Sequence, residues 1–260
     1  MTTTRSQFIL STIVEAGNLL LKTRDEKFTV ASKNGDSRDL VTSVDIVVDE
    51  FIKKAIGTAF PGESIYSEES ASSIDVAGSF WTIDPIDGTS NFSQGIPHYA
   101  VCIGYVEAGQ PIVGAVYNPV TKDLFSFEKG VGAFLNGTPI TVRTVDKLAE
   151  AHVLLHIGRK PELADWGLEL QRKLLSSAKK NLNLGSSALD ICFVAAGRAD
   201  ACIYGTLTTM DISVAVGILR EAGGEMYSEN GDQAGLSEKP QKVFATATRG
   251  LFWEIINNSK

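Results

Sequence analysis

Four acidic residues stand where apolar segments of the chain end or begin, and such boundaries are where functional side chains collect in folded proteins. Glu68 follows one apolar segment, Asp84 and Asp87 flank Pro85 at the end of another, and Asp211 opens a third. Magnesium in proteins binds a few carboxylates together with the phosphate oxygens of a substrate. The four acids are therefore candidate functional residues, and Asp84 and Asp87, which stand close together, are candidate ligands of a magnesium ion.

The residues after Asp87 are suited to hold that phosphate. Gly88 permits a tight turn after the strand that Pro85 ends, and Thr89 and Ser90 can begin a short helix. Free backbone N–H groups at the start of a helix attract anions. Two acids beside such a helix start are compatible with a bound anion when a cation joins them, so the stretch predicts a metal and a phosphate together.

Each of these acids also has a purely structural explanation. Asp-Pro and Asp-Gly are common turn sequences, and acidic residues are favoured near the starts of helices. Asp211 taken alone is explained by an N-cap, and Asp45 lies three residues after Thr42, as in a capping box. The chemistry therefore depends on the acids being brought together by the fold.

Composition and charge narrow the classes of function. Of the 260 residues, 43% are hydrophobic and 21% charged, which is typical of a globular protein with a sizeable core. The net charge is −7 and no long basic run occurs, which argues against nucleic acid as the main ligand. Cys102, Cys192 and Cys202 are widely spaced in apolar surroundings, so we expect buried thiols in a reducing compartment. With neither a signal-peptide pattern nor an apolar run of membrane-spanning length, we expect a cytoplasmic protein.

The first half of the chain predicts an α+β arrangement. Apolar residues at helical spacing predict amphipathic helices over residues 8–22 and 42–59, the second ended by Pro61 and Gly62. Residues 99–143 alternate apolar runs with Asn-Pro and Asn-Gly turns, which is typical of an antiparallel meander. The predicted strands cover residues 28–31, 39–41, 64–67, 80–83, 100–106, 112–117 and 124–128.

The second half alternates strands with helices and predicts a layered α/β arrangement. The change of pattern near Val145 divides the chain into residues 1–145, which carry most of the acids, and residues 146–260, which carry Asp211. We expect these halves to pack into one catalytic unit. The predicted strands are residues 152–157, 181–184, 199–204 and 243–247, and the predicted helices are residues 161–178, 186–196, 211–222 and 250–257.

Four sequence elements together resemble the inositol monophosphatase family. The family's first signature is similar to Trp81-x-x-Asp84-Pro85-x-Asp87-Gly88-Thr89-x-Asn91-Phe92, and its second is similar to Asp211-x-x-x-Ala215 with Glu221-Ala222-Gly223-Gly224. Its other acidic elements correspond to Asp39-Leu40-Val41-Thr42-x-x-Asp45 and Glu68-Glu69. The elements occur in the family's order and span most of the chain, which unrelated turns and caps do not explain.

The resemblance implies a fold and an activity. The fold would be the layered α-β-α-β-α sandwich of inositol monophosphatases, an α+β fold with an antiparallel-rich first half and an α/β second half. The activity would be magnesium-dependent hydrolysis of a small phosphomonoester by metal-activated water, without a covalent intermediate. Two or three Mg²⁺ ions per site, inhibition by lithium and a homodimer are also implied.

The resemblance also implies a role for each matching residue. Glu68, Asp84 and the backbone carbonyl of Ile86 would hold the metal that activates water. Asp84, Asp87 and Asp211 would hold a second metal near the leaving oxygen. Asp45 and Thr89 would orient the attacking water, and the amides of Gly88 and Thr89 would grip the phosphate.

The positions that would choose the leaving group depart from the family pattern. Tyr204 stands seven residues before Asp211, where inositol-hydrolysing members commonly place a glutamate that contacts the ring. Met210 replaces a usual tryptophan, and Ser187 lies where alanine is usual. Ser187 and Tyr204 are therefore predicted substrate contacts beside Asp87, Gly88, Thr89 and Asp211. An inositol monophosphate or related sugar phosphate is expected, with fructose 1,6-bisphosphate, histidinol phosphate or a 3′-phosphoadenosine nucleotide as alternatives.

Other classes of protein fit less well. A haloacid-dehalogenase-type phosphatase would have its acids two residues apart rather than three, with a nucleophilic aspartate. A calcium-binding loop would need alternating acids and a closing glutamate. A regulatory or binding module that keeps the fold remains an alternative. His152 and His156 lie on a strand-like run without the helical acid of a zinc protease, and are interpreted as buried or rim side chains.

Overall fold

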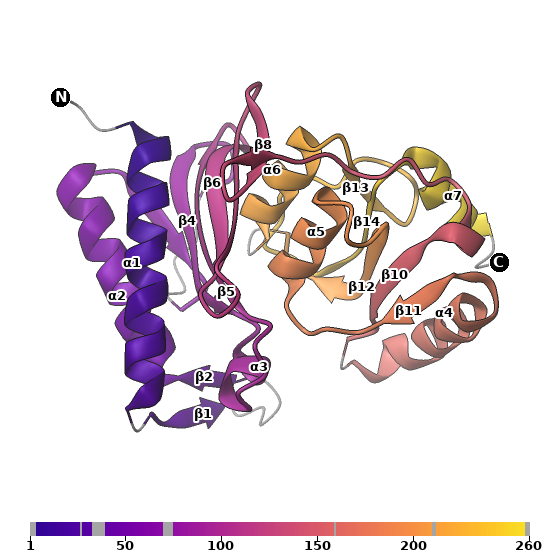
Figure 1. The fold of residues 1–260 in the computed structure, drawn as a ribbon, viewed down its shortest axis with the longest axis horizontal. Helices are drawn as coiled ribbons and strands as arrows, with labels where there is room; N and C mark the ends of the chain where they lie inside the picture. The colour runs from indigo at the N-terminus through magenta and orange to yellow at the C-terminus, as the bar shows by residue number, and fades with distance from the viewer. Residues whose placement is uncertain are drawn as a thin grey trace.

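The computed structural model describes residues 4–26, 28–32, 40–69, 75–158, 160–209 and 212–257. Within these ranges helices and sheets alternate in five layers, and the expected α-β-α-β-α sandwich is confirmed (Figure 1). Two helices cover the outer face of the first sheet, two lie between the sheets, and two cover the outer face of the second sheet. In that order they are α1 (Arg5–Asp25), α2 (Ser43–Ala59), α5 (Ser187–Ala195), α6 (Ser213–Glu221), α4 (Ala164–Ser177) and α7 (Arg249–Asn257).

The first sheet has seven described strands in sequence order, β3 to β9. β3 runs parallel to β4, and every later neighbour is antiparallel, so the predicted meander is confirmed. A separate two-stranded hairpin joins α1 to α2. The strands are β1 (Val30–Ser32), β2 (Leu40–Thr42), β3 (Ser64–Ser67), β4 (Ser79–Asp87), β5 (Ala100–Glu107), β6 (Gln110–Asn118), β7 (Asp123–Glu128), β8 (Gly132–Leu135) and β9 (Thr138–Pro139).

The second sheet has five described strands in the order β11-β10-β12-β14-β13. β11, β10 and β12 are parallel, and β14 pairs antiparallel with β12 and β13. Its residues all follow Val145, whereas those of the first sheet all precede it; the division at 145/146 stays a prediction. The strands are β10 (His152–His156), β11 (Lys180–Leu182), β12 (Ala201–Leu207), β13 (Glu225–Ser228) and β14 (Gln241–Thr246).

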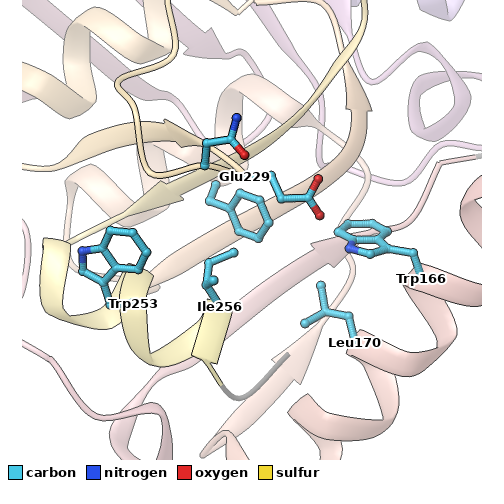
Figure 2. Close-up of a pocket in the computed structure, with 7 residues that line it drawn as sticks. Trp166, Leu170, Glu229, Trp253 and Ile256 are labelled. Atoms are coloured by element: carbon cyan, nitrogen blue, oxygen red, sulfur yellow. The ribbon is translucent and has the colours of Figure 1, made fainter. Parts of the chain in front are cut away.

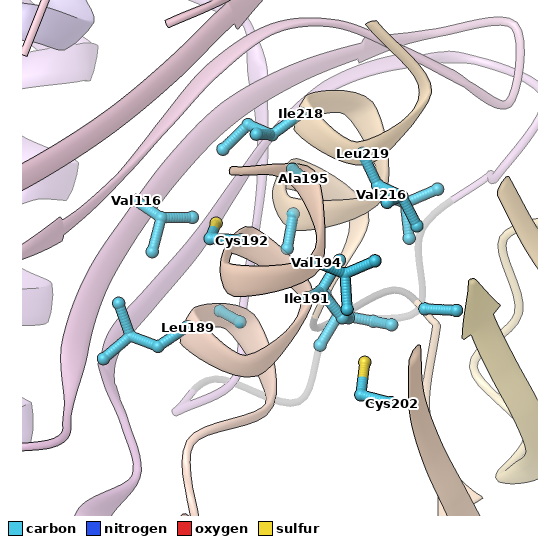
Figure 3. Packing of buried hydrophobic residues seen from close by; sticks show 14 of the residues in the cluster. Val116, Leu189, Ile191, Cys192, Val194, Ala195, Cys202, Val216, Ile218 and Leu219 are labelled. Carbon is cyan, nitrogen blue, oxygen red and sulfur yellow. The ribbon is translucent and has the colours of Figure 1, made fainter. Parts of the chain in front are cut away.

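The first sheet is buried on both faces, which explains its near-continuous apolar strands. In β5, Val101 and Ile103 pack with α1 and α2, whereas Ala100 and Cys102 pack toward α5 and α6. Close approach of α6 to this second face depends on glycine: a Cβ at Gly217 would lie 2.1 Å from an atom of the Phe127 ring. The layer between the two sheets is consequently dense and apolar (Figure 3).

Several element boundaries differ from those expected. β8, β9 and β13 are short strands that the apolar pattern did not predict. The helix expected from residue 161 becomes α-helical only at Ala164, because Pro161–Leu163 form a 3₁₀ turn (η3). A similar turn, η2 (Leu148–Glu150), precedes β10, and the short helix after β4 is α3 (Thr89–Ser93). Across the described ranges, the helices lack the length and apolar character needed to cross a membrane.

All three cysteines are free and buried, as predicted, and Cys192 and Cys202 lie in the layer between the sheets (Figure 3). Burial, assisted by the charges of nearby carboxylates, raises the pKa of each thiol well above its usual 9.0. The thiols therefore keep their protons in the folded protein at a pH where the unfolded chain loses them.

Stability should consequently fall above pH 9, because only the unfolded chain then releases thiol protons. Each thiol is expected to lower the free energy of unfolding by about 1.4 kcal/mol per pH unit between the unfolded and folded pKa values. Urea denaturation from pH 7 to pH 10 measures this slope. Cys192→Ala should have a shallower slope than the wild type; equal slopes would contradict the assignment.

Candidate functional site

Asp84 and Asp87 lie on the same face of β4 because the strand contains a bulge. Asp84 pairs with Cys102 and Asp87 with Ala100, so three steps along β4 oppose two along β5. Residues three apart on a regular strand would point to opposite faces. Here both carboxylates share the face of Cys102 and Ala100, toward α5 and α6, and both are buried.

Glu68 joins these acids from the neighbouring strand. β3 runs parallel to β4 with Ser67 opposite Ile83, and the Glu68 N–H donates to the Ile83 carbonyl at 3.2 Å. Glu68 and Asp84 are therefore adjacent at the same end of the sheet. Cys102 lies opposite Asp84 on β5, and after burial itself the charges of Asp84, Asp87 and Glu68 raise the pKa of its thiol.

Asp45, Thr89 and Ile86 form a connected group beside the acids. Thr42 and Asp45 make the predicted capping box at the start of α2, and the Asp45 carboxylate accepts from the Thr42 N–H at 2.8 Å. The Thr89 hydroxyl lies 2.9 Å from the Ile86 carbonyl oxygen and 3.4 Å from Asp45 Oδ1. Asp45 is thus both a capping residue and a partner of Thr89, because its two carboxylate oxygens serve different neighbours.

The Asp87 carboxylate is held by the first turn of α5. It accepts hydrogen bonds from the Ser186 hydroxyl, the Ser187 N–H and hydroxyl at 3.2 and 2.6 Å, and the Ala188 N–H at 2.9 Å. Burial nevertheless raises the pKa of Asp87, although these hydrogen bonds oppose the shift. The predicted site residues Asp87 and Ser187, a hundred positions apart in the sequence, are therefore in direct contact.

Gly88 and Asn91 fix the short helix α3 against the same part of the second half. Gly88 has φ of +94°, and a Cβ there would lie 3.1 Å from the His98 carbonyl and 3.3 Å from the Gly185 carbonyl. The Asn91 amide donates to the carbonyls of His98 and Leu184, both at 2.8 Å. Asn91 of the signature therefore ties the turn after β4 to the segment before α5.

Tyr204, on β12, contacts α5 through Asp190. Its side chain is buried, its hydroxyl donates to Asp190 at 3.0 Å, and its ring stacks on His156 at 5.1 Å between centroids. Tyr204 as a substrate contact stays a prediction. Asp211 and Met210 lie outside the described residues, so the roles given to them also stay predictions.

The donor types fit a hard divalent cation. The described ligand candidates are the carboxylates of Glu68, Asp84 and Asp87 and the Ile86 carbonyl, all of which are oxygen donors. Burial raises the pKa of the Asp87 carboxylate, and a bound cation would oppose this shift by stabilising the ionised form. Within the described ranges, no three His, Cys, Asp or Glu side chains complete a metal cage by themselves. Asp211, the remaining carboxylate of the predicted set, lies outside the described residues.

Ser186, Asp190 and His98 were not among the site residues predicted from the sequence. Ser186 is a side-chain cap of α5, and a Ser-Ser pair before an apolar helix is a recognisable cap signal. Asp190 is the only acid in the apolar run of α5, and its carboxylate lies 2.9 Å from His98 Nε2. A lone charge in a buried helix is the signal that could have identified it.

The candidate site residues are separate from a cavity on the outer face of the second sheet. A cavity of about 480 Å³ lies between α4 and α7, on the outer face of the second sheet (Figure 2). None of the predicted site residues lines it. Its lining residues are Trp166, Leu170, Glu229, Asn230, Phe244, Trp253 and Ile256.

Comparison with known proteins identifies the family of this chain. The model of the inositol monophosphatase family matches residues 3–258. The chain is 32% identical over 250 residues to the Nus factor SuhB of Pasteurella multocida, covering 94% of this chain and 91% of that protein. It is 31% identical over 235 residues to the fructose-1,6-bisphosphatase/inositol-1-monophosphatase of Thermotoga maritima, covering 90% and 89%. The crystal structure of the extragenic suppressor protein SuhB from Bartonella henselae superposes with a TM-score of 0.89 at 26% identity over 97% of each chain. The chain therefore belongs to the inositol monophosphatase family.

Proposed function

We propose that this protein is a magnesium-dependent phosphatase that hydrolyses a small phosphomonoester without a covalent intermediate. The observation that carries the proposal is the bulge in β4, which turns Asp84 and Asp87 to one face, next to Glu68. Membership of a family of generally metal-dependent phosphatases also supports it.

The chain's own residues would divide the work as follows. Glu68, Asp84, Asp87, Asp211 and the Ile86 carbonyl would hold two or three Mg²⁺ ions. When bound, magnesium supplies charge neutralisation of the phosphoryl group and a lowered pKa of the attacking water. Asp45 and Thr89 would orient that water, since their oxygens already lie within 3.4 Å of each other. The amides of Gly88 and Thr89 would hold the phosphate, because positioning and electrostatics dominate phosphoryl transfer.

The leaving group would be an inositol or a related sugar. The relative from Thermotoga maritima is named for both fructose 1,6-bisphosphate and inositol monophosphate, so fructose 1,6-bisphosphate competes directly as the substrate. Histidinol phosphate and a 3′-phosphoadenosine nucleotide are further candidate substrates. Ser187 and Tyr204 are the proposed specificity positions, because they lie on the α5 and β12 side of the acids.

A second candidate function is regulatory. The relative from Pasteurella multocida is named a Nus factor, so a role through a protein partner competes with the enzymatic one. Under either function, we propose a cytoplasmic homodimer that acts as one unit made of residues 1–145 and 146–260. Inhibition by lithium is proposed only for the phosphatase function.

Phosphate release with and without magnesium tests the proposal. We expect release from at least one member of a panel of inositol phosphates, fructose 1,6-bisphosphate, histidinol phosphate and adenosine phosphates, and loss of release in EDTA with recovery on adding Mg²⁺. Asp87→Asn should abolish it, because the second metal loses a ligand.

Two outcomes would contradict the proposal. No release from the whole panel, with unchanged binding of a protein partner by Asp87→Asn, would favour the regulatory role. An aspartyl phosphate trapped during turnover would favour the covalent mechanism of the haloacid-dehalogenase type.

A further inference from the structure

Asp190 is a charged residue in the centre of an apolar helix. Its side chain is fully buried (0% exposed), whereas its neighbours on α5 pack into the apolar layer between the sheets (Figure 3). A buried carboxylate is costly unless it is hydrogen-bonded or paired. Retaining one here therefore requires specific partners.

Three side chains from separate segments provide those partners. His98 Nε2 lies 2.9 Å from Asp190 Oδ1, and the Tyr204 hydroxyl donates to Oδ2 at 3.0 Å. His156 Nε2 lies 3.6 Å from the same Oδ2. The segment before β5, strand β10 and strand β12 thus all contact α5 through one carboxylate.

The partners keep Asp190 ionised. Burial alone would raise its pKa, but the hydrogen bonds and charges of His156 and His98 outweigh burial and hold the pKa below its usual value. An ionised acceptor makes shorter and stronger hydrogen bonds than a neutral one. Asp190 is therefore a fixed attachment point for α5 at neutral pH.

This attachment point is one helical turn from the groups that hold Asp87. The Asp190 N–H donates to the Ser186 carbonyl at 3.0 Å, so a helical backbone hydrogen bond links the two residues directly. When its Nε2 carries no proton, His156 accepts from the Gly185 N–H at 3.2 Å, just before that turn, instead of donating to Asp190. The same cluster thus secures the start of α5 from both sides.

We propose that Asp190 is a positioning residue: together with His98, His156 and Tyr204 it fixes the first turn of α5, so that Ser186, Ser187 and Ala188 orient the Asp87 carboxylate for metal binding. The inference rests on the proposed role of Asp87 as a metal ligand. Residues that orient a metal ligand through hydrogen bonds generally affect metal affinity more than substrate affinity.

The test compares Asp190→Ala and Asp190→Asn with the wild type. Two readouts are used: the thermal stabilisation of the protein as a function of MgCl₂ concentration, and phosphate release. Asp190→Ala should raise the half-saturating magnesium concentration about tenfold or more. The KM for the phosphomonoester at saturating magnesium should rise by a smaller factor than the half-saturating magnesium concentration. Asp190→Asn, which still accepts hydrogen bonds, should recover part of the loss.

Asp200→Asn is the matched control. Asp200 is also fully buried and accepts from the His152 N–H at 2.8 Å and Arg143 at 3.1 Å, but has no contact with α5 among these bonds. It should lower the melting temperature without changing the half-saturating magnesium concentration. If Asp190→Ala does not fold, Tyr204→Phe removes one hydrogen bond and should shift half-saturation about fivefold.

Unchanged half-saturation in the Asp190 or Tyr204 variants, or an equal shift in Asp200→Asn, would overturn the inference while leaving the proposed function intact. A wild-type protein that shows neither stabilisation by magnesium nor phosphate release would overturn both.

Discussion

Asp84→Asn is expected to lower turnover by about a thousandfold while leaving the protein folded. The amide has almost the shape of the carboxylate, and its oxygen can still accept from the Ile86 N–H, which lies 3.0 Å from Asp84 Oδ1. The negative charge that both proposed metals share is lost, however. Phosphate release at saturating magnesium measures the loss, and circular dichroism with thermal unfolding checks the fold.

Asp123→Asn controls for the loss of one carboxylate from the first sheet. Asp123 pairs with Arg198 on the surface and contacts none of the proposed ligands in that pair. It should retain wild-type turnover. Activity of Asp84→Asn near that of the wild type under saturating magnesium would mean that the metal site has been assigned to the wrong residues.

Gly88→Ala should damage stability and activity together. The residue has φ of +94°, which alanine disfavours, and its Cβ would meet the carbonyls of His98 and Gly185 at 3.1 and 3.3 Å. We expect the free energy of unfolding to fall by about 2 kcal/mol. Displacement of the proposed phosphate-holding amides should lower turnover by about tenfold to a hundredfold.

Gly95→Ala separates the effect of a positive φ from the effect of the close contacts that a Cβ would make. Gly95 has a similar φ of +73°, but nothing lies within 4 Å of the position that its Cβ would take. It should lose about 1 kcal/mol of stability from backbone strain and keep its activity. If both variants lose equal activity, the close contacts of Gly88 would not be what positions the site.

Local patterns predicted the elements whose cause is local. The capping box of Thr42 and Asp45, the turns of the meander and the apolar helices all follow from neighbouring residues, and the structure confirms them. In α2, Val47 is 39% exposed, so the buried face of this helix is narrower than its set of apolar residues. β8, β9 and β13 were missed because strands of two to four residues carry too few alternations to register.

The acids of the candidate site were predictable because their spacing is part of a family signature. The residues that hold these acids through hydrogen bonds were not predictable. Ser186 and Asp190 belong to the start of α5, His98 and His156 come from two other segments, and only the folded chain brings them together. Long-range contacts of this kind cannot be read from neighbouring residues in the sequence. Tyr204 illustrates this, since its hydroxyl is used by Asp190, which no local pattern indicates.

The bulge in β4 also means that the two acids cannot be moved to another protein without their backbone. Side chains on a regular strand point alternately to its two faces. The extra residue of the bulge shifts this alternation by one position, so that both acids point to the same face. Copying Asp84 and Asp87, three residues apart, onto an uninterrupted strand of another scaffold would send them to opposite faces of its sheet. If one residue between them were deleted, a regular strand would keep both acids on one face. The deletion would, however, remove the extra residue that β4 has relative to β5 near Ile86. The insertion therefore has to be transplanted with the carboxylates.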